Sequence, residues 1–290
     1  SVLIVPQPTC KGCEYLFNVF TTKDVSATEK HLSVSVVDMR RNNGNGAIIE
    51  QNTVLHTNTT ERLVSSRNDA DSTYWVITHD YGNNTFRVYH ATTGGLSESG
   101  VYNLGQAHDT EAKGEGQMKF SSADSSGKRT LAVIVPGPPE NFVELFTFND
   151  EDGKLEYKRT ISLGTAPPKA YGVEFSPDQE KLYVSLMGVD GAASKLLQYD
   201  LSIEGDSLLQ ASALVIDSSA TDKFGSLQIA PDGKIYMAID GSDYLAVIGE
   251  PDQTSLRTLE YEREGVHLGG KKSKLGLPNF VQNFTENSDG

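Results

Sequence analysis

Residues 171–185 read YGVEFSPDQEKLYVS, and much of the remaining chain repeats this pattern. Apolar and polar residues alternate, a turn follows at SPD (176–178), and the alternation resumes, which is typical of two strands joined by a tight turn. The pattern returns as FGSLQIAPDGKIYMA at 224–238 and, with a longer turn, as GQMKFSSADSSGKRTLAVIV at 116–135. An earlier copy without the proline, ERLVSSRNDADSTYWVITH, occupies 61–79. The chain is therefore predicted to consist of repeated β units.

The spacing of the copies predicts how the units are arranged. The ends of their first strands are 55, 55 and 54 residues apart, at Ser65, Phe120, Phe175 and Ile229. A period of this size with about four strand-like segments is typical of β-propeller blades. One four-stranded blade cannot bury both of its faces, whereas blades stacked in a ring can. No window keeps a helical spacing of apolar residues over about ten positions, so a packed α/β fold is not expected.

We predict an all-β protein with a single β-propeller domain of four-stranded blades at residues 1–284. The expected segments are blades at 1–57, 58–106, 115–164, 170–217 and 224–268, a closing strand at 275–284 and a disordered tail at 285–290. The closing strand has no blade of its own, so we expect it to belong with strands upstream of Ser1. The only tryptophan, Trp75, lies mid-strand and is expected to pack between blades.

Composition excludes several classes of partner. The formal net charge is −14 and the pI is near 4.8, which argues against nucleic acid or an anionic membrane. No segment approaches the ~18 apolar residues needed to span a bilayer, so we expect a soluble chain without membrane insertion. Cys10 and Cys13 form a single CxxC, which lacks the second ligand pair of a structural zinc site. A short disulfide is expected, with two free thiols as the alternative.

Motifs that would indicate catalysis are missing or incomplete. The sequence contains neither HExxH nor GxSxG. The turn NDEDGK at 149–154 begins like a calcium loop but lacks the Glu at the twelfth position. The segment GVHLGGKK at 265–272 resembles a P-loop, but it ends in Lys and no helix follows. A Ser-His-Asp triad assembled from several blades stays open, because such triads are defined by geometry.

The order of the strand motifs resembles a propeller module of bacterial surface proteins that use the type IX secretion route and are associated with gliding motility. The motifs are SVLIVPQP, YLFNVFTT, SVSVVDM, TTERL, YWVITH, YGVEFSPD, KLYVS, LLQYDLS, LQIAPDGKIYMA, YLAVIGEP and LGLPNF. The resemblance runs from Ser1 to Phe284. It implies an extracellular or cell-surface propeller, seven-bladed when intact, in a larger modular protein that serves adhesion or presentation. The family pattern has an earlier strand pair, so about five full blades plus partial strands are expected here.

Loops crowd one face of a propeller around its axis, and loops on rigid scaffolds often carry function. The loop residues expected to bind a ligand are Arg62, His79, Tyr81, Asn141 and Tyr171. The first interpretation is a non-catalytic module without a cofactor that binds a surface glycan or protein, or presents other domains.

Two other interpretations stay open. One is a metal-dependent propeller lactonase or hydrolase, whose axial divalent cation, with Ca²⁺ as the candidate, would be held by Glu61, Glu115 and Asn279. The other is a purely structural spacer that binds nothing.

Overall fold

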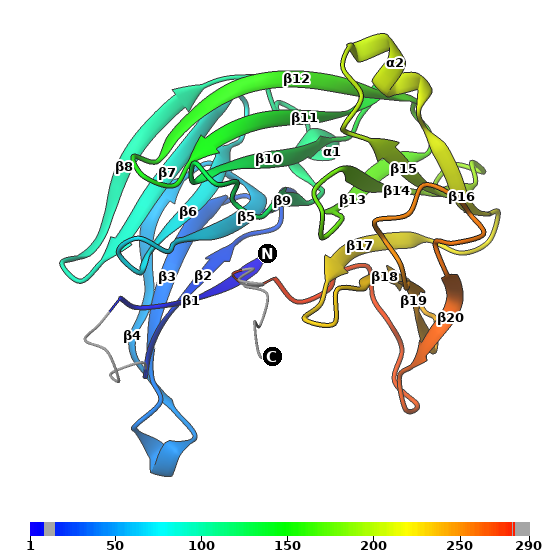
Figure 1. The fold of residues 1–290 in the computed structure, drawn as a ribbon. Helices are drawn as coiled ribbons and strands as arrows, with labels where there is room; N and C mark the ends of the chain where they lie inside the picture. The colour runs from blue at the N-terminus through cyan, green and yellow to red at the C-terminus, as the bar shows by residue number, and fades with distance from the viewer. Residues whose placement is uncertain (9–14, 280, 282–290) are drawn as a thin grey trace.

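The computed structural model describes residues 1–8, 15–279 and 281, which form five antiparallel sheets of four strands each. Consecutive strands are neighbours in every sheet, so each sheet is a simple meander. The sheets follow one another along an arc, with the first and the last at its two ends (Figure 1). The predicted all-β architecture of four-stranded units is confirmed, and five sheets are consistent with the expected number of full blades.

The first three sheets occupy the N-terminal part of the chain. The first contains β1 (Val2–Pro6), β2 (Leu16–Thr22), β3 (His31–Asp38) and β4 (Ala47–Thr57). The second contains β5 (Thr59–Asn68), β6 (Thr73–Asp80), β7 (Thr85–Thr92) and β8 (Gly95–Asn103). The third contains β9 (Met118–Phe120), β10 (Lys128–Val135), β11 (Glu140–Asn149) and β12 (Lys154–Thr165).

Two more sheets and three short helical turns complete the described chain. The fourth sheet contains β13 (Lys169–Phe175), β14 (Lys181–Met187), β15 (Ser194–Asp200) and β16 (Leu214–Ser219). The fifth contains β17 (Phe224–Ile229), β18 (Ile235–Ile239), β19 (Tyr244–Ile248) and β20 (Tyr261–His267). The helical turns are η1 (Asn42–Gly44), α1 (Glu111–Gly114) and α2 (Asp206–Ala211).

Hydrophobic packing between successive sheets holds the arc together. Four buried clusters lie between sheets one and two, two and three, three and four, and four and five. Trp75 belongs to the cluster between the second and third sheets, where its Nε1 donates to the Asp150 carbonyl at 2.8 Å. The expected packing role of Trp75 is therefore confirmed. Alternation along each strand supplies apolar side chains to both faces, which is why a sheet can join two clusters.

The first strand of each sheet lies nearest the centre of the arc (Figure 1), and polar side chains there connect neighbouring sheets. Gln117, directly before β9, accepts hydrogen bonds from the backbone N–H groups of Val173 on β13 (3.1 Å) and Leu227 on β17 (2.8 Å). The Glu174 carboxylate on β13 accepts from the Ile229 N–H at 3.0 Å. These bonds use side chains to satisfy backbone groups at the crowded centre.

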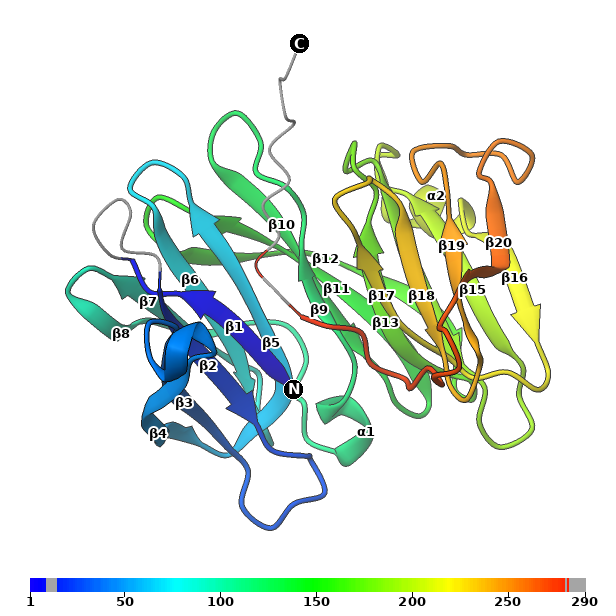
Figure 2. The same cartoon turned by 90° about the horizontal axis from the view of Figure 1, so that it is seen from below.

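The predicted closing strand at 275–284 requires a correction within the residues that the structure describes. Residues 275–279 form no strand. They cross the centre instead: the Leu275 carbonyl accepts from the Ser226 N–H at 2.7 Å, and Asn279 Nδ2 donates to the Leu63 carbonyl at 2.8 Å. The segment thus connects β17 to β5 (Figure 2, red) through single hydrogen bonds rather than a ladder. LGLPN contains a glycine and a proline, which both disfavour a paired strand.

The buried charges at the centre generate a stability prediction. Lys119 Nζ lies 3.5 Å from Glu174 Oε2 and both side chains are almost fully buried. Glu174→Gln leaves the Lys119 ammonium buried without an anion, so we expect a loss of about 3–5 kcal/mol in the free energy of unfolding. The double variant Lys119→Met/Glu174→Gln should recover part of that loss. Urea denaturation measures both values.

The matched control is Glu180→Gln, because Glu180 pairs with Lys181 at 3.5 Å but is largely exposed. This variant should change the free energy of unfolding by less than about 0.5 kcal/mol. If Glu174→Gln lowers the free energy of unfolding as little as Glu180→Gln does, the buried Lys119–Glu174 ion pair does not stabilise the fold.

Candidate functional site

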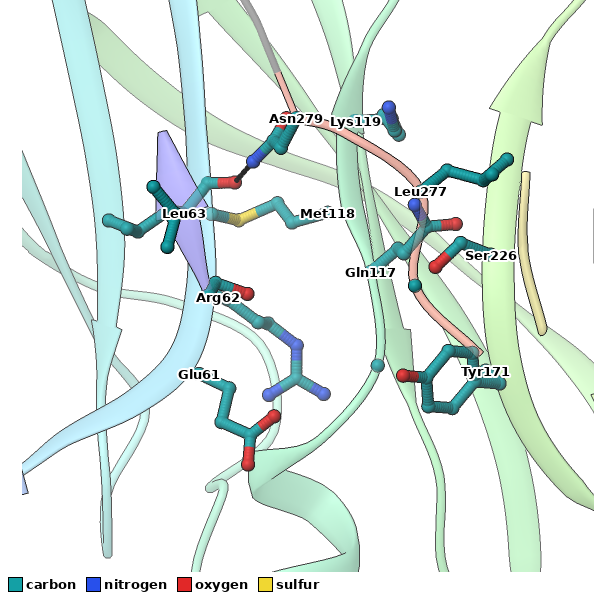
Figure 3. Close-up of a pocket in the computed structure, with 14 residues that line it drawn as sticks. Glu61, Arg62, Leu63, Gln117, Met118, Lys119, Tyr171, Ser226, Leu277 and Asn279 are labelled. Carbon is teal, nitrogen blue, oxygen red and sulfur yellow. Dashed lines mark hydrogen bonds between the residues drawn. The ribbon is translucent and has the colours of Figure 1, made fainter. Parts of the chain in front are cut away.

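A small cavity lies where the innermost strands meet the C-terminal segment. Its volume is about 190 Å³, and all five sheets contribute to its walls. Figure 3 shows Glu61 and Arg62 on one side, Gln117 and Tyr171 on the other, and the segment carrying Leu277 and Asn279 passing over the cavity. Side chains separated by more than two hundred residues in sequence are therefore neighbours only because the sheets surround one centre.

The wall of this axial cavity has an accessible part and a buried part. Glu61, Gln117, Tyr171 and Asn279 are partly exposed, so a ligand in the cavity can reach their carboxylate, amide and phenol groups. Lys119, Ser226 and Arg62 also line the cavity but are almost fully buried. The accessible surface thus offers hydrogen-bond donors and acceptors next to one aromatic ring.

Arg62 supports the cavity wall from behind. Its side chain is 1% exposed, and its guanidinium donates to the carbonyls of Lys113 (2.7 Å), Glu115 and Ile134 and to His108 Nδ1 (3.1 Å). Burial lowers the pKa of Arg62, but four acceptors stabilise its charged form. Arg62 therefore ties β5 to β10 and to the turn around α1, and its side chain is almost fully buried although it lines the cavity.

Two histidines stack behind Arg62. The rings of His79 and His108 are 3.6 Å apart, and both side chains are fully buried. Since a carbonyl can only accept, His79 Nδ1 donates to the Asp80 carbonyl at 2.6 Å, whereas His108 Nδ1 accepts from Arg62. Because its Nδ1 accepts, His108 is a neutral imidazole. Burial, with Arg62 nearby, lowers the pKa of His79 to about 3; burial and the neighbouring cations also lower the pKa of His108 well below its usual value.

Glu61 is the accessible charged side chain contributed by β5. One carboxylate oxygen accepts from the Val25 N–H at 3.1 Å, so the loop that carries Val25 orients the group. Burial raises the pKa of Glu61, and burial also raises the pKa of Tyr171 across the cavity. The Glu61 carboxylate can accept further hydrogen bonds, while the Tyr171 hydroxyl stays protonated at neutral pH.

The remaining sequence candidates lie away from the cavity. The Asn141 side chain is fully buried, accepting from the Ala170 N–H at 3.0 Å and donating to the Pro168 carbonyl at 2.8 Å. It organises the entry to β13 and does not face a ligand. Tyr81 is half-buried beneath the Lys30 ammonium, which lies 4.7 Å from its ring centre. Tyr171 alone of the five predicted ligand contacts lines the cavity with an accessible side chain.

Sequence reasoning missed Gln117 and Ser226, although the repeat contains a signal for them. Both residues stand three positions before the repeat anchors Phe120 and Ile229, as Arg62 does before Ser65. Because side chains alternate along a strand, equivalent positions in different blades face the same way. Aligning the copies at this position would have grouped Arg62, Gln117 and Ser226, which all line the cavity.

The alternative metal site is only partly assembled. Glu61 and Asn279 line the same cavity, but the Glu115 carboxylate forms an ion pair with Lys169. Among residues 1–8, 15–279 and 281, no three His, Cys, Asp or Glu side chains cluster in a way that could hold an ion. Two oxygen donors are fewer than Ca²⁺ takes from most protein sites. Water and a ligand would have to complete the coordination.

Two further expectations concern other parts of the chain. Cys10 and Cys13, the predicted disulfide, lie outside the described residues. Within the described part, no helix has the length and apolar character needed to cross a bilayer.

Comparison with known proteins extends the description of the fold. No protein-family model and no curated protein matches the chain. A protein of unknown function from Desulfotomaculum acetoxidans matches with a TM-score of 0.53 and 13% identity, over 90% of this chain and 68% of that one. An exo-β-1,3-galactanase from Phanerochaete chrysosporium matches with a TM-score of 0.50 and 13% identity, over 90% and 65%.

A third solved structure, Sqt1 from Chaetomium thermophilum, has a TM-score of 0.49 and 16% identity, over 87% of this chain and 58% of its own. The chain thus spans less than two thirds of the length of Sqt1 and of the galactanase. At these identities the matches describe the fold alone. The class that fold and cavity define is a β-propeller of four-stranded blades with a small polar cavity at its centre.

The buried histidines predict a pH dependence. In the unfolded chain a histidine titrates near 6.5, whereas His79 and His108 stay neutral when folded. Below pH 6.5 the unfolded chain binds more protons, so stability is lost as pH falls toward the folded pKa of His79, about 3. We expect the free energy of unfolding to fall by about 1.4 kcal/mol for each histidine and each pH unit below 6.5. Urea unfolding at pH 7 and pH 5 measures this loss.

The variants His79→Gln and His267→Gln test the assignment. His79→Gln should reduce the loss between pH 7 and pH 5, whereas the exposed His267 can be replaced without changing it. Equal stability of the wild type at both pH values would show that the buried pair does not control acid sensitivity.

Proposed function

We propose that this propeller is a non-catalytic module that holds the terminal residue of a surface glycan in the axial cavity. The accessible wall carries the proposal: Glu61 and Asn279 provide hydrogen-bonding groups and Tyr171 provides an aromatic ring. Sugar rings present hydroxyl groups around an apolar face, and this combination suits such a wall. Glu61 is the one carboxylate among the described residues that line the cavity, whereas glycoside hydrolases typically use a pair of carboxylates.

The size of the cavity limits the ligand. A volume of about 190 Å³ is smaller than the ~300–1,000 Å³ of pockets that enclose drug-sized molecules. One sugar ring fits this scale, whereas a longer segment would have to continue outside. The proposed ligand is therefore the terminal sugar of a glycan.

The fold comparison helps to rank the ligands for testing. The matched galactanase was solved with a β-1,3-galactotriose, so saccharides come first, although the match extends only to the fold. The resemblance of the strand motifs to type IX-secreted surface modules supports an extracellular or cell-surface location for the proposed binding. In this setting the module would also present neighbouring domains of a larger protein.

A glycan array followed by calorimetry tests the proposal. The wild type should bind a defined terminal sugar, and Tyr171→Ala or Glu61→Gln should weaken binding at least about tenfold, because each removes one principal contact worth about 1.4 kcal/mol. Tyr157→Ala is the matched control, since Tyr157 is exposed on β12, away from the cavity. Melting temperatures verify that each variant is folded. Absence of any glycan binding, or equal affinity of Tyr171→Ala and the control, contradicts the proposal.

The metal-dependent lactonase or hydrolase is the second candidate, because Glu61 and Asn279 share the cavity. A cation that binds only the folded chain at a hundred times its dissociation constant stabilises it by about 2.7 kcal/mol. For a chain of this size that raises the melting temperature by roughly 5–10 °C. Melts with EDTA, Ca²⁺, Mg²⁺ and Zn²⁺ measure the shift, and Glu61→Gln should remove it. A cation-specific shift followed by lactone or ester turnover would favour this enzyme over the binding module.

A further inference from the structure

Glu61 lies in a part of β5 that does not by itself fix the direction of a side chain. Thr59 on β5 pairs with Asp80 on β6, and the next pair joins Leu63 to Thr78, so the intervening residues of β5 bulge out of the ladder. Ladder pairing gives a strand residue a defined direction, and a bulge removes that constraint locally. The one carboxylate among the described residues of the cavity wall (Figure 3) is therefore oriented by contacts from outside β5.

The first sheet supplies those contacts. The Val25 N–H, in the connection between β2 and β3, donates to Glu61 Oε1 at 3.1 Å. The Thr22 hydroxyl, at the end of β2, donates to the Glu61 carbonyl at 3.2 Å. Within the described chain, the bond from Val25 is the single hydrogen bond made to this carboxylate. The position of Val25 therefore decides where the carboxylate points.

Val25 is held in place by the last residue of α1. Its side chain is 2% exposed and lies against Gly114, where a Cβ atom would come within 2.6 Å of Val25 Cγ1 and 3.4 Å of Tyr81 Cδ2. Carbon atoms in contact are usually about 3.5–4.0 Å apart, so no side chain fits on Gly114 while Val25 stays where it is. A helical turn such as α1 accepts alanine readily. The close approach of Val25, and not the backbone, therefore requires glycine here.

The helical turn is fixed more firmly than the connection that carries Val25. The carbonyls of Lys113 and Glu115, on either side of the glycine, both accept from the guanidinium of Arg62, which is 1% exposed. The connection between β2 and β3, in contrast, is largely exposed. A larger side chain at position 114 would therefore displace Val25 and leave α1 in place.

We propose that Gly114 is a positioning residue of the axial cavity, which leaves room for Val25 and so places the N–H group that holds the Glu61 carboxylate at the cavity. Gly114 is not itself among the residues that line the cavity. The inference rests on the proposed function in taking Glu61 as a ligand contact. The placement of the carboxylate is measured without a ligand, so the two can fail separately.

Amide NMR of the isotope-labelled chain from about pH 7 to pH 4 tests the placement, because burial raises the pKa of Glu61 into this range. The Val25 amide signal should shift as the Glu61 carboxylate is protonated, and Glu61→Gln should abolish this transition. Asp24, the neighbouring carboxylate, titrates at lower pH, because the Ser26 hydroxyl donates to it and lowers its pKa. Its effect on the same amide is therefore a separate transition.

Gly114→Ala should lose most of the Glu61-dependent shift, because the new methyl group displaces Val25 from the carboxylate. The double variant Val25→Ala/Gly114→Ala should regain the shift, since the shorter side chain removes Cγ1 and keeps the N–H group. Gly94→Ala is the matched control: Gly94 lies in the turn between β7 and β8, where a Cβ atom would meet only Thr92 Oγ1, at 3.4 Å. The control should titrate like the wild type.

Melting temperatures show whether each variant is folded. Val25→Ile replaces Gly114→Ala if the alanine variant unfolds, because the larger side chain crowds the same contact from the other side. A wild type without a Glu61-dependent shift at the Val25 amide overturns the inference, as does a shift that Gly114→Ala leaves unchanged.

Calorimetry with the saccharide that the glycan array selects measures the effect on binding. Gly114→Ala should weaken binding about tenfold, as Glu61→Gln does, and Val25→Ala/Gly114→Ala should recover most of the loss. Unchanged affinity in a Gly114→Ala variant that has lost the NMR shift overturns the positioning role. If no saccharide binds but the shift behaves as expected, glycan binding is wrong, and the placement of Glu61 by Gly114 is retained.

Discussion

Each four-stranded sheet of this protein has two faces that must be kept from water, and the rest of the architecture follows from that constraint. Apolar side chains alternate to both sides of the strands, so every inner sheet joins two hydrophobic clusters. When the sheets stack in sequence order around a centre, both faces of each inner sheet are covered and the connections between sheets stay short. It also leaves the first sheet with an aliphatic face that no described residue covers, which explains why the exposed aliphatic side chains concentrate there.

Convergence of the inner strands creates a different problem at the centre, where backbone groups are crowded and partly buried. Polar side chains solve it: Gln117 and Glu174 accept from the backbone of neighbouring sheets, and Arg62 donates to three carbonyls. Two of these side chains, Gln117 and Arg62, also line the cavity. A binding site and a structural network therefore share their residues, and only the partly exposed members, such as Glu61 and Tyr171, remain free to contact a ligand.

Much of the fold was predictable from the sequence, whereas the site was only partly so. Strand alternation and turn residues recur at a regular interval, and these local signals identify four-stranded units because they depend on neighbours in the chain. Tyr171, predicted as a ligand contact, and Glu61 and Asn279, predicted as metal ligands in the alternative interpretation, line the same cavity. Arg62, His79 and Asn141 were placed in ligand-binding loops, yet all three are buried. A loop position does not reveal which side chains turn inward to satisfy backbone groups.

The sequence by itself therefore determined the all-β class, the repeated four-stranded unit, the acidic charge and the packing role of Trp75. These properties depend on the repeat period, the amino-acid composition and the residues at the turns, all of which can be read directly from the sequence. Only the tertiary structure decided that residues 275–279 cross the centre without forming a strand, that Gln117 and Ser226 face a common cavity, and that one face of the first sheet is left open. Those outcomes depend on contacts between residues 50 to 220 positions apart, whose geometry follows from how the sheets stack and not from any local pattern.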